Sequence, residues 1–216
     1  MLFFWMRQAA LFPTLDPAPR PRVPGLVVKP DYIDEAEEKR LLAKIEEEPW
    51  GADFKRRVQL YGLGYGGDEG GEVTWVRDFP PWLEELGQRL TREGWLPRSP
   101  ENCVVNDYAP GVGIGPHRDY PPFGSVIAAV SLLSDVVIDF ARPDGVEKFP
   151  TLVPARSLWV ASGEARWRWT HGIAPRLSDV IEGERRRRGR RVSVTFRIAK
   201  DPAAVARARE AAKAAG

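Results

Sequence analysis

Residues 102–119 read Asn-Cys-Val-Val-Asn-Asp-Tyr-Ala-Pro-Gly-Val-Gly-Ile-Gly-Pro-His-Arg-Asp, and two short motifs in this stretch decide how the chain is interpreted. The first motif is Asn106-x-Tyr108, and the second is His117-x-Asp119. The two residues of each motif are two positions apart, so on an extended strand both side chains point to the same face. We therefore expect strands that present each pair of polar side chains together.

The histidines suggest what the second motif does. The chain has only two histidines, His117 and the distant His171. A histidine is more often a packing or surface residue, and an H-x-D motif by itself is a weak signal. Two imidazoles and one carboxylate, however, form the facial ligand set that holds Fe(II) and leaves coordination positions open for oxygen chemistry. The sequence thus predicts a metal site of His117, Asp119 and His171.

A strictly alternating segment near the end of the chain supports this prediction. Residues 191–198 read Arg-Val-Ser-Val-Thr-Phe-Arg-Ile, which places Arg191, Ser193 and Arg197 on one face and apolar residues on the other. One explanation is an edge strand with a solvated face. The other is a strand whose arginines face a barrel interior, where buried charges need anionic partners. A small dicarboxylate would match the planar fork of arginine.

Together these motifs resemble the AlkB family of Fe(II)/2-oxoglutarate dioxygenases. The resemblance covers about residues 24–199 and rests on N-x-Y, H-x-D, the later His-Gly-Ile at 171–173 and R-x5-R. It is nearest to the oxygenase domain of the tRNA wobble-uridine hydroxylase branch. That likeness extends through residues 57–59, 110–114, 139–145 and 169–173.

The resemblance implies a role for each motif residue, with Fe(II), 2-oxoglutarate and O2 as cofactor and cosubstrates. His117, Asp119 and His171 would ligate iron and form the catalytic centre. Arg191 and Tyr108 would bind the distal carboxylate of 2-oxoglutarate, and Arg197 and Asn106 would lie at the end that chelates the metal. Ser193, which replaces an amide side chain of some relatives, would also contact 2-oxoglutarate. Position 121, where bacterial repair members carry a second acid, is Pro121 here.

The expected fold class is α+β, mainly β. Short strands at 102–108, 125–133, 135–141, 156–161, 165–171 and 190–199 suggest a sandwich or barrel. The resemblance specifies a double-stranded β-helix, or jelly roll, with N-terminal helices packed on one sheet. Two such helices are expected, one after the capping box that starts at Asp34 and one from Pro81 to about Gly94.

The expected organisation is an N-terminal arm and Pro-rich linker at 1–24, a dioxygenase domain at 25–200 and an Ala-rich tail at 201–216 that forms a solvated helix. A hydrophobic content of 43% and eight tryptophans indicate a folded globule, whereas a net charge of +2 does not by itself indicate a polyanionic partner. The single Cys103 excludes an internal disulfide and is expected to be a buried strand thiol in a cytoplasmic protein. The apolar run at 2–6 is too short to span a bilayer, and we expect a monomer.

Two regions are candidates for substrate binding. The first is the glycine-rich loop at 62–71, a region that forms a lid over the substrate in AlkB-like folds. Three aromatic residues in or near this loop would either stack on a base or pack in the core: Tyr61, Tyr65 and Trp75. The basic run at 185–190, which includes Arg186 and Arg187, is either a solvated loop or a patch that contacts phosphates.

Three functions follow from these observations. The first is oxidative demethylation or hydroxylation of a modified nucleobase, as in RNA modification or DNA repair, and Pro121 and the branch likeness favour RNA, such as tRNA, over alkylated DNA. The second is a dioxygenase that acts on a protein side chain or a small molecule. The third is a nucleic-acid-binding module without catalysis, which the complete ligand motifs argue against.

Overall fold

A computed structural model describes residues 23–51, 55–65 and 73–215. The strands are β1 (Leu26–Lys29), β2 (Arg57–Tyr65), β3 (Val73–Trp75), β4 (Asn102–Tyr108), β5 (Ile114–His117), β6 (Phe123–Leu132), β7 (Val136–Ala141), β8 (Lys148–Val153), β9 (Leu158–Ser162), β10 (Thr170–Ile173), β11 (Ser178–Ile181), β12 (Glu184–Arg187) and β13 (Arg191–Ala199). The helices are α1 (Glu35–Glu47), α2 (Pro81–Arg92), α3 (Gly163–Trp167) and α4 (Pro202–Ala215).

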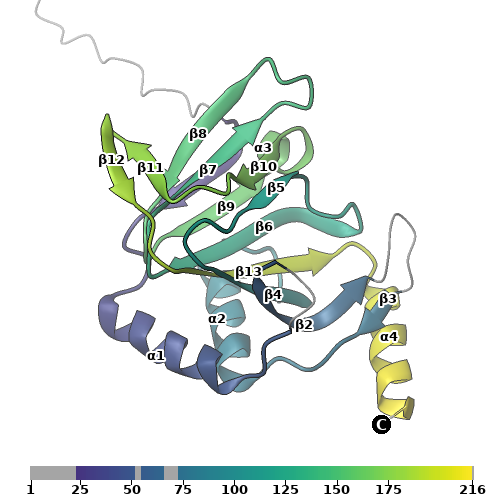
Figure 1. Cartoon of the computed structure of the whole chain (residues 1–216). Coiled ribbons are helices and arrows are strands. Elements are labelled where there is room, and N and C mark those ends of the chain that lie inside the picture. Colours follow the sequence, from purple (N-terminus) through teal and green to yellow (C-terminus); the bar gives the residue numbers. More distant parts are fainter. Residues whose placement is uncertain (1–22, 52–54, 66–72, 216) are drawn as a thin grey trace, which may run out of the picture.

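The strands form two main antiparallel sheets (Figure 1). The larger sheet has the strand order β1-β9-β6-β13-β4-β2-β3, and the smaller has the order β5-β10-β7-β8, while β11 and β12 form a separate hairpin. This arrangement confirms the expected mainly β fold of the α+β class. Because strands distant in the sequence are neighbours in each sheet, the chain must wind around several times before its motifs meet.

Helices α1 and α2 lie against the outer face of the larger sheet (Figure 1). The side chain of Asp34 caps α1 by accepting the backbone N–H of Glu37 at 2.7 Å, as the capping box predicts. Ile45 of α1 and Leu90 of α2 are completely buried, and they share a core cluster with Val194 of β13. Burial of each such side chain contributes about 2 kcal/mol, so the helices hold this sheet in place.

Alternation along the central strands separates this core from a cavity. On β13, Val192, Val194 and Phe196 are buried in the core against the helices, whereas Arg191, Ser193 and Arg197 line a cavity on the other face. Strand β4 follows the same rule with Asn106 and Tyr108 on the cavity side. The interpretation of 191–198 as a solvated edge strand is therefore wrong, because β13 lies between β6 and β4.

The two sheets enclose a second core that is rich in aromatic side chains. It includes Phe140, Trp159 and Trp169, all of which are buried. These tryptophans pack in the core between the sheets. Cys103 is a buried free thiol on β4, as predicted, and burial raises its pKa well above the usual range.

Some expected elements differ from the structure. The strand expected at 165–171 is wrong, because residues 163–167 form the short helix α3 and the strand begins only at Thr170. The tail helix is present as α4, but it is not fully solvated, since Val205 and Ala208 are buried and α4 lies beside β3 (Figure 1). Most of the expected N-terminal arm, together with residues 66–72 of the glycine-rich loop, lies outside the described residues. Among the helices that the structure describes, none is long and apolar enough to span a membrane.

Candidate active site

The two histidines meet across a pair of antiparallel strands. His117 ends β5 and His171 lies in β10, and the two residues are direct partners in the strand register. Their ring centroids are 4.4 Å apart. Gly172 permits this approach, because a Cβ at that position would lie 2.9 Å from the backbone nitrogen of Pro116. The prediction that the histidines converge is confirmed.

Asp119 joins the histidines from the loop that follows β5. It is not on the strand itself, which ends at His117, yet its buried Oδ2 lies 3.6 Å from Nε2 of His171. Its Oδ1 accepts a hydrogen bond from Nε of Arg197 at 2.5 Å. The three predicted metal ligands thus gather at one place, with the carboxylate also held by an arginine.

Burial and charge set the protonation states of this group. Burial alone would raise the pKa of Asp119, but the guanidinium of Arg197 and the two imidazoles hold it below its usual range. Burial lowers the pKa of His171 to about 4, against the opposing attraction of Asp119. At neutral pH the carboxylate is therefore ionised and His171 is neutral, which are the forms that bind a metal ion.

The donor set fits a ferrous ion, although the side chains are not closed around one. In the described residues no group of three or more His, Cys, Asp or Glu side chains is already placed to hold a metal. Oδ1 of Asp119 is held by Arg197, and its other oxygen, Oδ2, faces His171 and is the oxygen that would bind the metal. Nδ1 of His117 lies 2.9 Å from the carbonyl oxygen of Gly115, which accounts for that nitrogen as a donor and leaves Nε2 as a metal ligand. Two imidazoles and a carboxylate are the ligands that non-haem Fe(II) oxygenases use.

Arg191 is a buried cation on the wall of the same cavity. Its residue exposure is 4%, its Nε donates to Oγ of Ser131 at 3.0 Å, and its guanidinium lies 5.5 Å from the ring centroid of Tyr108. Within the described part of the chain it has no carboxylate partner, and burial lowers its pKa to about 10. A buried guanidinium without a counter-ion is costly, so the site is suited to an anionic ligand.

Arg197 differs from Arg191 because it already has partners. It pairs with Asp119, and its Nη1 donates to Oδ1 of Asn102 at 3.2 Å. Asn106, which was expected with Arg197 at the chelating end of 2-oxoglutarate, lines the same cavity and accepts a hydrogen bond from Nε of Arg56 at 2.8 Å. Sequence reasoning missed Asn102 and Arg56, although Asn102 has the same even spacing along β4 as Asn106.

The predicted residues line one cavity of about 340 Å³ between the sheets. Its lining includes His117, Asp119, His171, Asn106, Tyr108, Arg191, Ser193 and Arg197. The hydroxyl of Ser193 lies 3.1 Å from that of Thr195. A small dicarboxylate could therefore bind with one end at the guanidinium of Arg191 and the other at the metal-ligand group.

Arg166, which the sequence analysis did not select, fixes the loop that carries Asp119. This buried side chain donates to the carbonyl oxygens of Asp119 at 3.0 Å, Tyr120 at 3.0 Å, Phe123 at 3.3 Å and Gly124 at 3.1 Å. Two of these bonds tie α3 to the loop between β5 and β6, and the other two tie it to the start of β6. The loop is therefore held by tertiary contacts and not by regular secondary structure.

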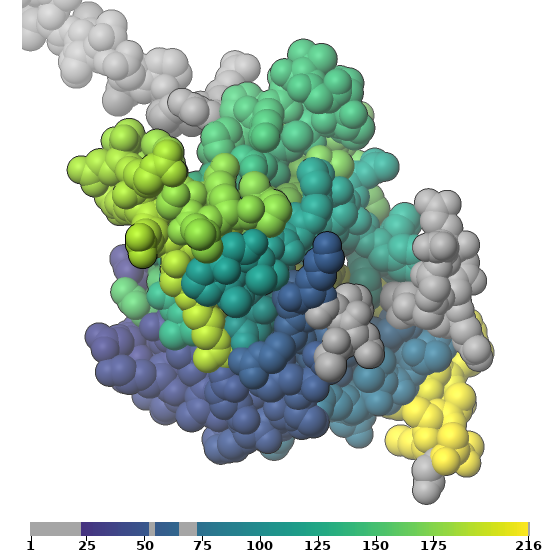
Figure 2. Space-filling view, viewed as in Figure 1, coloured from purple at the N-terminus to yellow at the C-terminus, as the bar shows by residue number. Residues whose placement is uncertain are grey.

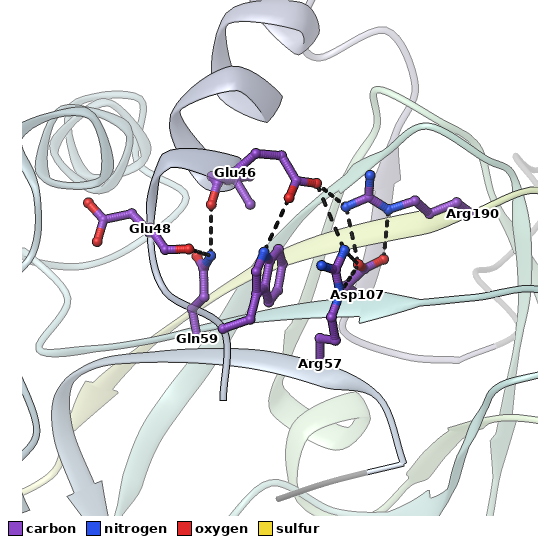
Figure 3. Close-up of polar contacts among 8 residues, drawn as sticks. Glu46, Glu48, Arg57, Gln59, Asp107 and Arg190 are labelled. Atoms are coloured by element: carbon purple, nitrogen blue, oxygen red, sulfur yellow. Dashed lines mark hydrogen bonds and ion pairs between the residues drawn. The ribbon is translucent and has the colours of Figure 1, made fainter. Parts of the chain in front are cut away.

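A second network supports the strands behind the cavity (Figure 3). The buried carboxylate of Asp107 pairs with Arg57 of β2 and with Arg190 just before β13, and Arg190 also pairs with Glu46 of α1. The amide of Gln59 donates to the carbonyl oxygen of Ile45 at 2.8 Å. These contacts fix β2, β4 and the start of β13 relative to one another, and thereby the residues that line the cavity.

The residues expected to bind the substrate are not gathered at the cavity. Tyr61 has an exposure of 1%, and its hydroxyl donates to Oε1 of Gln59, so core packing is the correct interpretation. Trp75 of β3 lies under the guanidinium of Arg209, 4.1 Å from its ring centroid, and the side chain of Tyr65 lies outside the described residues. Neither Tyr61 nor Trp75 is among the described residues that line the cavity.

Arg186 and Arg187 lie on β12, in the exposed hairpin that stands at the margin of the molecule (Figure 2). The hairpin is anchored by the buried Asp179, whose carboxylate accepts hydrogen bonds from Arg176 and Arg188, each at 2.7 Å. The basic run is therefore neither a simple loop nor part of the described cavity wall. The candidate phosphate contacts of this run stay a prediction.

Comparisons with known proteins agree with this geometry. Residues 54–197 match the family described as the 2OG-Fe(II) oxygenase superfamily. An uncharacterized protein L905 from Acanthamoeba polyphaga mimivirus is 34% identical over 178 residues, which cover 80% of this chain and 84% of that protein.

A Xenopus tropicalis protein named tRNA (carboxymethyluridine(34)-5-O)-methyltransferase alkbh8 is 32% identical over 167 residues. The match covers 74% of this chain but only 26% of the Xenopus protein. Among solved structures, that of OsALKBH1 superposes with a TM-score of 0.61 at 14% identity, covering 81% of this chain and 97% of the other. This likeness confirms the jelly-roll fold.

Proposed function

The chain belongs to the 2OG-Fe(II) oxygenase superfamily and is AlkB-like, and from this premise we propose that it oxidises a modified nucleobase, with RNA favoured over alkylated DNA. Membership of the family makes it a dioxygenase that uses Fe(II), 2-oxoglutarate and O2. The choice of substrate is the part that is proposed.

The observation that carries the proposal is the shared cavity of three metal-ligand side chains and a buried arginine that is suited to an anion. We assign His117, Asp119 and His171 as the ligands, because they offer two imidazole nitrogens and one carboxylate at one place. Arg191 and Tyr108 would hold the distal carboxylate of 2-oxoglutarate. With Fe(II) and 2-oxoglutarate bound, the site would supply an oxidation by O2, in which one oxygen atom enters succinate as 2-oxoglutarate loses CO2 and the other hydroxylates a C–H group of the substrate.

The remaining residues of the cavity orient the reactants. Arg197 steadies the carboxylate of Asp119 through a charge-assisted hydrogen bond, and Arg166 holds the backbone of the same loop. Ser193 contributes a hydroxyl between the two arginines of β13. Preorganised groups of this kind position reactants without reorganisation at the moment of reaction.

Two observations support RNA as the substrate. Position 121, two residues after Asp119, is a proline and thus has no carboxylate with which to contact a base. A relative of this chain is named as a tRNA-modifying enzyme. A base in a loop of RNA is already splayed out, whereas a base in a duplex must be extruded first.

Product analysis tests the proposal. The protein is incubated with Fe(II), 2-oxoglutarate and either total tRNA or alkylated single-stranded DNA, and nucleosides and succinate are quantified by mass spectrometry. We expect succinate formation to increase with tRNA and to coincide with the loss or oxidation of one modified nucleoside. Replacement of His171 by alanine should abolish both signals, whereas replacement of the exposed Arg92 on α2 should leave both unchanged. Succinate formation that no nucleic acid increases, but that a peptide or small molecule does, would refute the nucleobase proposal.

A further inference from the structure

Trp167 supports cationic side chains at the edge of the active-site cavity. This half-buried residue ends α3, and the ammonium group of Lys200 lies 4.4 Å from its ring centroid. The guanidinium of Arg118 donates from Nη1 to the carbonyl oxygen of Trp167 at 3.1 Å. We name Arg118, Trp167 and Lys200 the Trp167 rim.

The rim is attached firmly to the metal-ligand loop. Arg118 lies between His117 and Asp119 in the sequence and lines the cavity itself. The backbone N–H of Lys200 donates to the carbonyl oxygen of Pro122 at 2.8 Å, which joins the end of β13 to this loop. The two exposed cations are therefore held in place next to the entrance of the cavity, and binding an anion there requires little ordering of the chain.

Neither Arg118 nor Lys200 forms an ion pair with a carboxylate in the part of the chain that the structure describes. Many other surface arginines are already in ion pairs, such as Arg142 with Glu147 at 3.2 Å and Arg176 with Asp179 at 2.7 Å. Arg118 uses one of its donors on Trp167, which leaves most of its fork for a ligand.

The buried charge beneath the rim strengthens its attraction for anions. The guanidinium of Arg166 lies 4.1 Å from the ring centroid of Trp167, and its hydrogen bonds are to carbonyl oxygens and not to a carboxylate. The carboxylate of Asp119 attracts this charge, but Arg197 pairs with the same carboxylate, so the three groups together retain one net positive charge. Clustered charges of one sign beside a cavity raise the local concentration of an oppositely charged ligand.

From these contacts we propose that Arg118 and Lys200 form a phosphate site for single-stranded nucleic acid, which binds the backbone next to the base in the cavity. The inference rests on the proposed function, because a nucleic-acid strand places a backbone phosphate beside a base that has entered the cavity. Phosphate contacts of this kind give affinity and orientation without sequence choice. The site differs from the basic run, whose Arg186 pairs with Glu184 at 3.7 Å on the separate hairpin.

Binding measurements on a set of variants test the proposal. The fluorescence anisotropy of a labelled unmodified single-stranded RNA is recorded against protein loaded with Mn(II) and 2-oxoglutarate, at several salt concentrations. The variants are Arg118→Gln, Lys200→Gln, the double variant, and Arg92→Gln as a control of equal charge change. Thermal unfolding of each variant is recorded to establish that it is folded, as the exposure of Arg118 and Lys200 leads us to expect.

We expect each single substitution to weaken binding roughly 3- to 5-fold, because the contacts are exposed ion pairs. The slope of log affinity against log salt should fall by about 0.7 for each phosphate that is no longer neutralised, and thus by about 1.4 in the double variant. Arg118→Lys should retain most of the slope, since it keeps the charge. The control should bind as the unaltered protein does.

Two results would overturn the proposal, and they are distinguishable. If the unaltered protein binds RNA but the double variant has the same affinity and salt slope, the rim is not a phosphate site and the proposed function still stands. If the unaltered protein binds neither RNA nor single-stranded DNA, the proposed function and the rim site fail together.

Discussion

Replacing Arg191 with methionine should stabilise the protein in the absence of 2-oxoglutarate and remove the stabilisation that 2-oxoglutarate confers. The reason is the environment of this side chain, which is buried on the cavity wall with one hydrogen bond, to Ser131. Methionine has a similar length and no charge. The variant therefore separates the cost of burying the guanidinium from its benefit as a ligand for a carboxylate.

The structure sets the size of the effect. The fall of the Arg191 pKa on burial, from its ordinary value to about 10, corresponds to about 3 kcal/mol of unfavourable free energy for the charged form. Loss of the bond to Ser131 and of the interaction with the Tyr108 ring costs about 1 kcal/mol each. The net gain of about 1 kcal/mol should raise the melting temperature by about 2 to 4 °C for a chain of this size. For the unaltered protein, 2-oxoglutarate at about 100 times its Kd should add about 2.7 kcal/mol.

Thermal unfolding with Mn(II), with and without 2-oxoglutarate, measures both quantities. We expect the variant to melt higher than the unaltered protein without 2-oxoglutarate and lower with it. Arg197→Met is the matched control, and it should be destabilised by about 3 to 5 kcal/mol, because it leaves the buried Asp119 without its cation. An Arg191→Met protein that still gains stability from 2-oxoglutarate would refute the assignment of this residue.

Three further predictions follow from buried groups. Asp179→Asn should lower the free energy of unfolding by about 3 to 5 kcal/mol in a denaturant titration, because Arg188 is left as a buried unpaired cation, and an unchanged midpoint would show that the hairpin anchor is unimportant. Arg166→Met should weaken Mn(II) binding in a calorimetric titration, since four hydrogen bonds that hold the loop carrying Asp119 and the strand after it are lost. Arg166→Lys should have an intermediate Mn(II) affinity. An Arg166→Met protein that binds Mn(II) as tightly as the unaltered protein would count against a positioning role for this residue. Cys103 should not react with a thiol reagent until the protein unfolds, because burial raises its pKa, and rapid labelling of the folded protein would contradict the structure.

The arginine motif could be predicted from the sequence because the spacing of its residues determines their face, whereas Asp119 lies in the loop after β5 and not on the strand that its spacing from His117 suggested. The even separation of Arg191 and Arg197 places both on one side of β13, and this held in the structure. The contact between the two histidines follows from ligand chemistry and the family resemblance and not from local strand pattern, because it depends on the register of β5 against β10. No local pattern in the sequence specifies that register.

The prediction that Tyr61 stacks on a base failed for a related reason. Alternation on β2 shows that Leu60 and Tyr61 lie on opposite faces, but it does not say which face meets the helices. In the structure Leu60 lines the cavity and Tyr61 packs against Phe79 in the core. The assignment of faces is made by α1 and α2, whose position is a tertiary property.

The prediction of a strand at 165–171 was also wrong because of tertiary contacts. Residues 163–167 alternate in a way that suits a strand, yet Gly163 adopts a φ of 50° and Arg166 turns inward to bind four carbonyl groups of a distant loop. Bonds between residues more than 40 positions apart outweigh a weak local preference. For the same reason neither Arg166 nor the Trp167 rim could be found from the sequence.

The most direct test of the central claim is the stoichiometry of metal binding. Isothermal titration with Mn(II) in the presence of 2-oxoglutarate should give one ion per chain for the unaltered protein. Each of His117→Ala, Asp119→Ala and His171→Ala should lose most of this affinity while retaining a cooperative unfolding transition. Folded variants that bind Mn(II) as tightly as the unaltered protein would contradict the claim that these three side chains form the metal site.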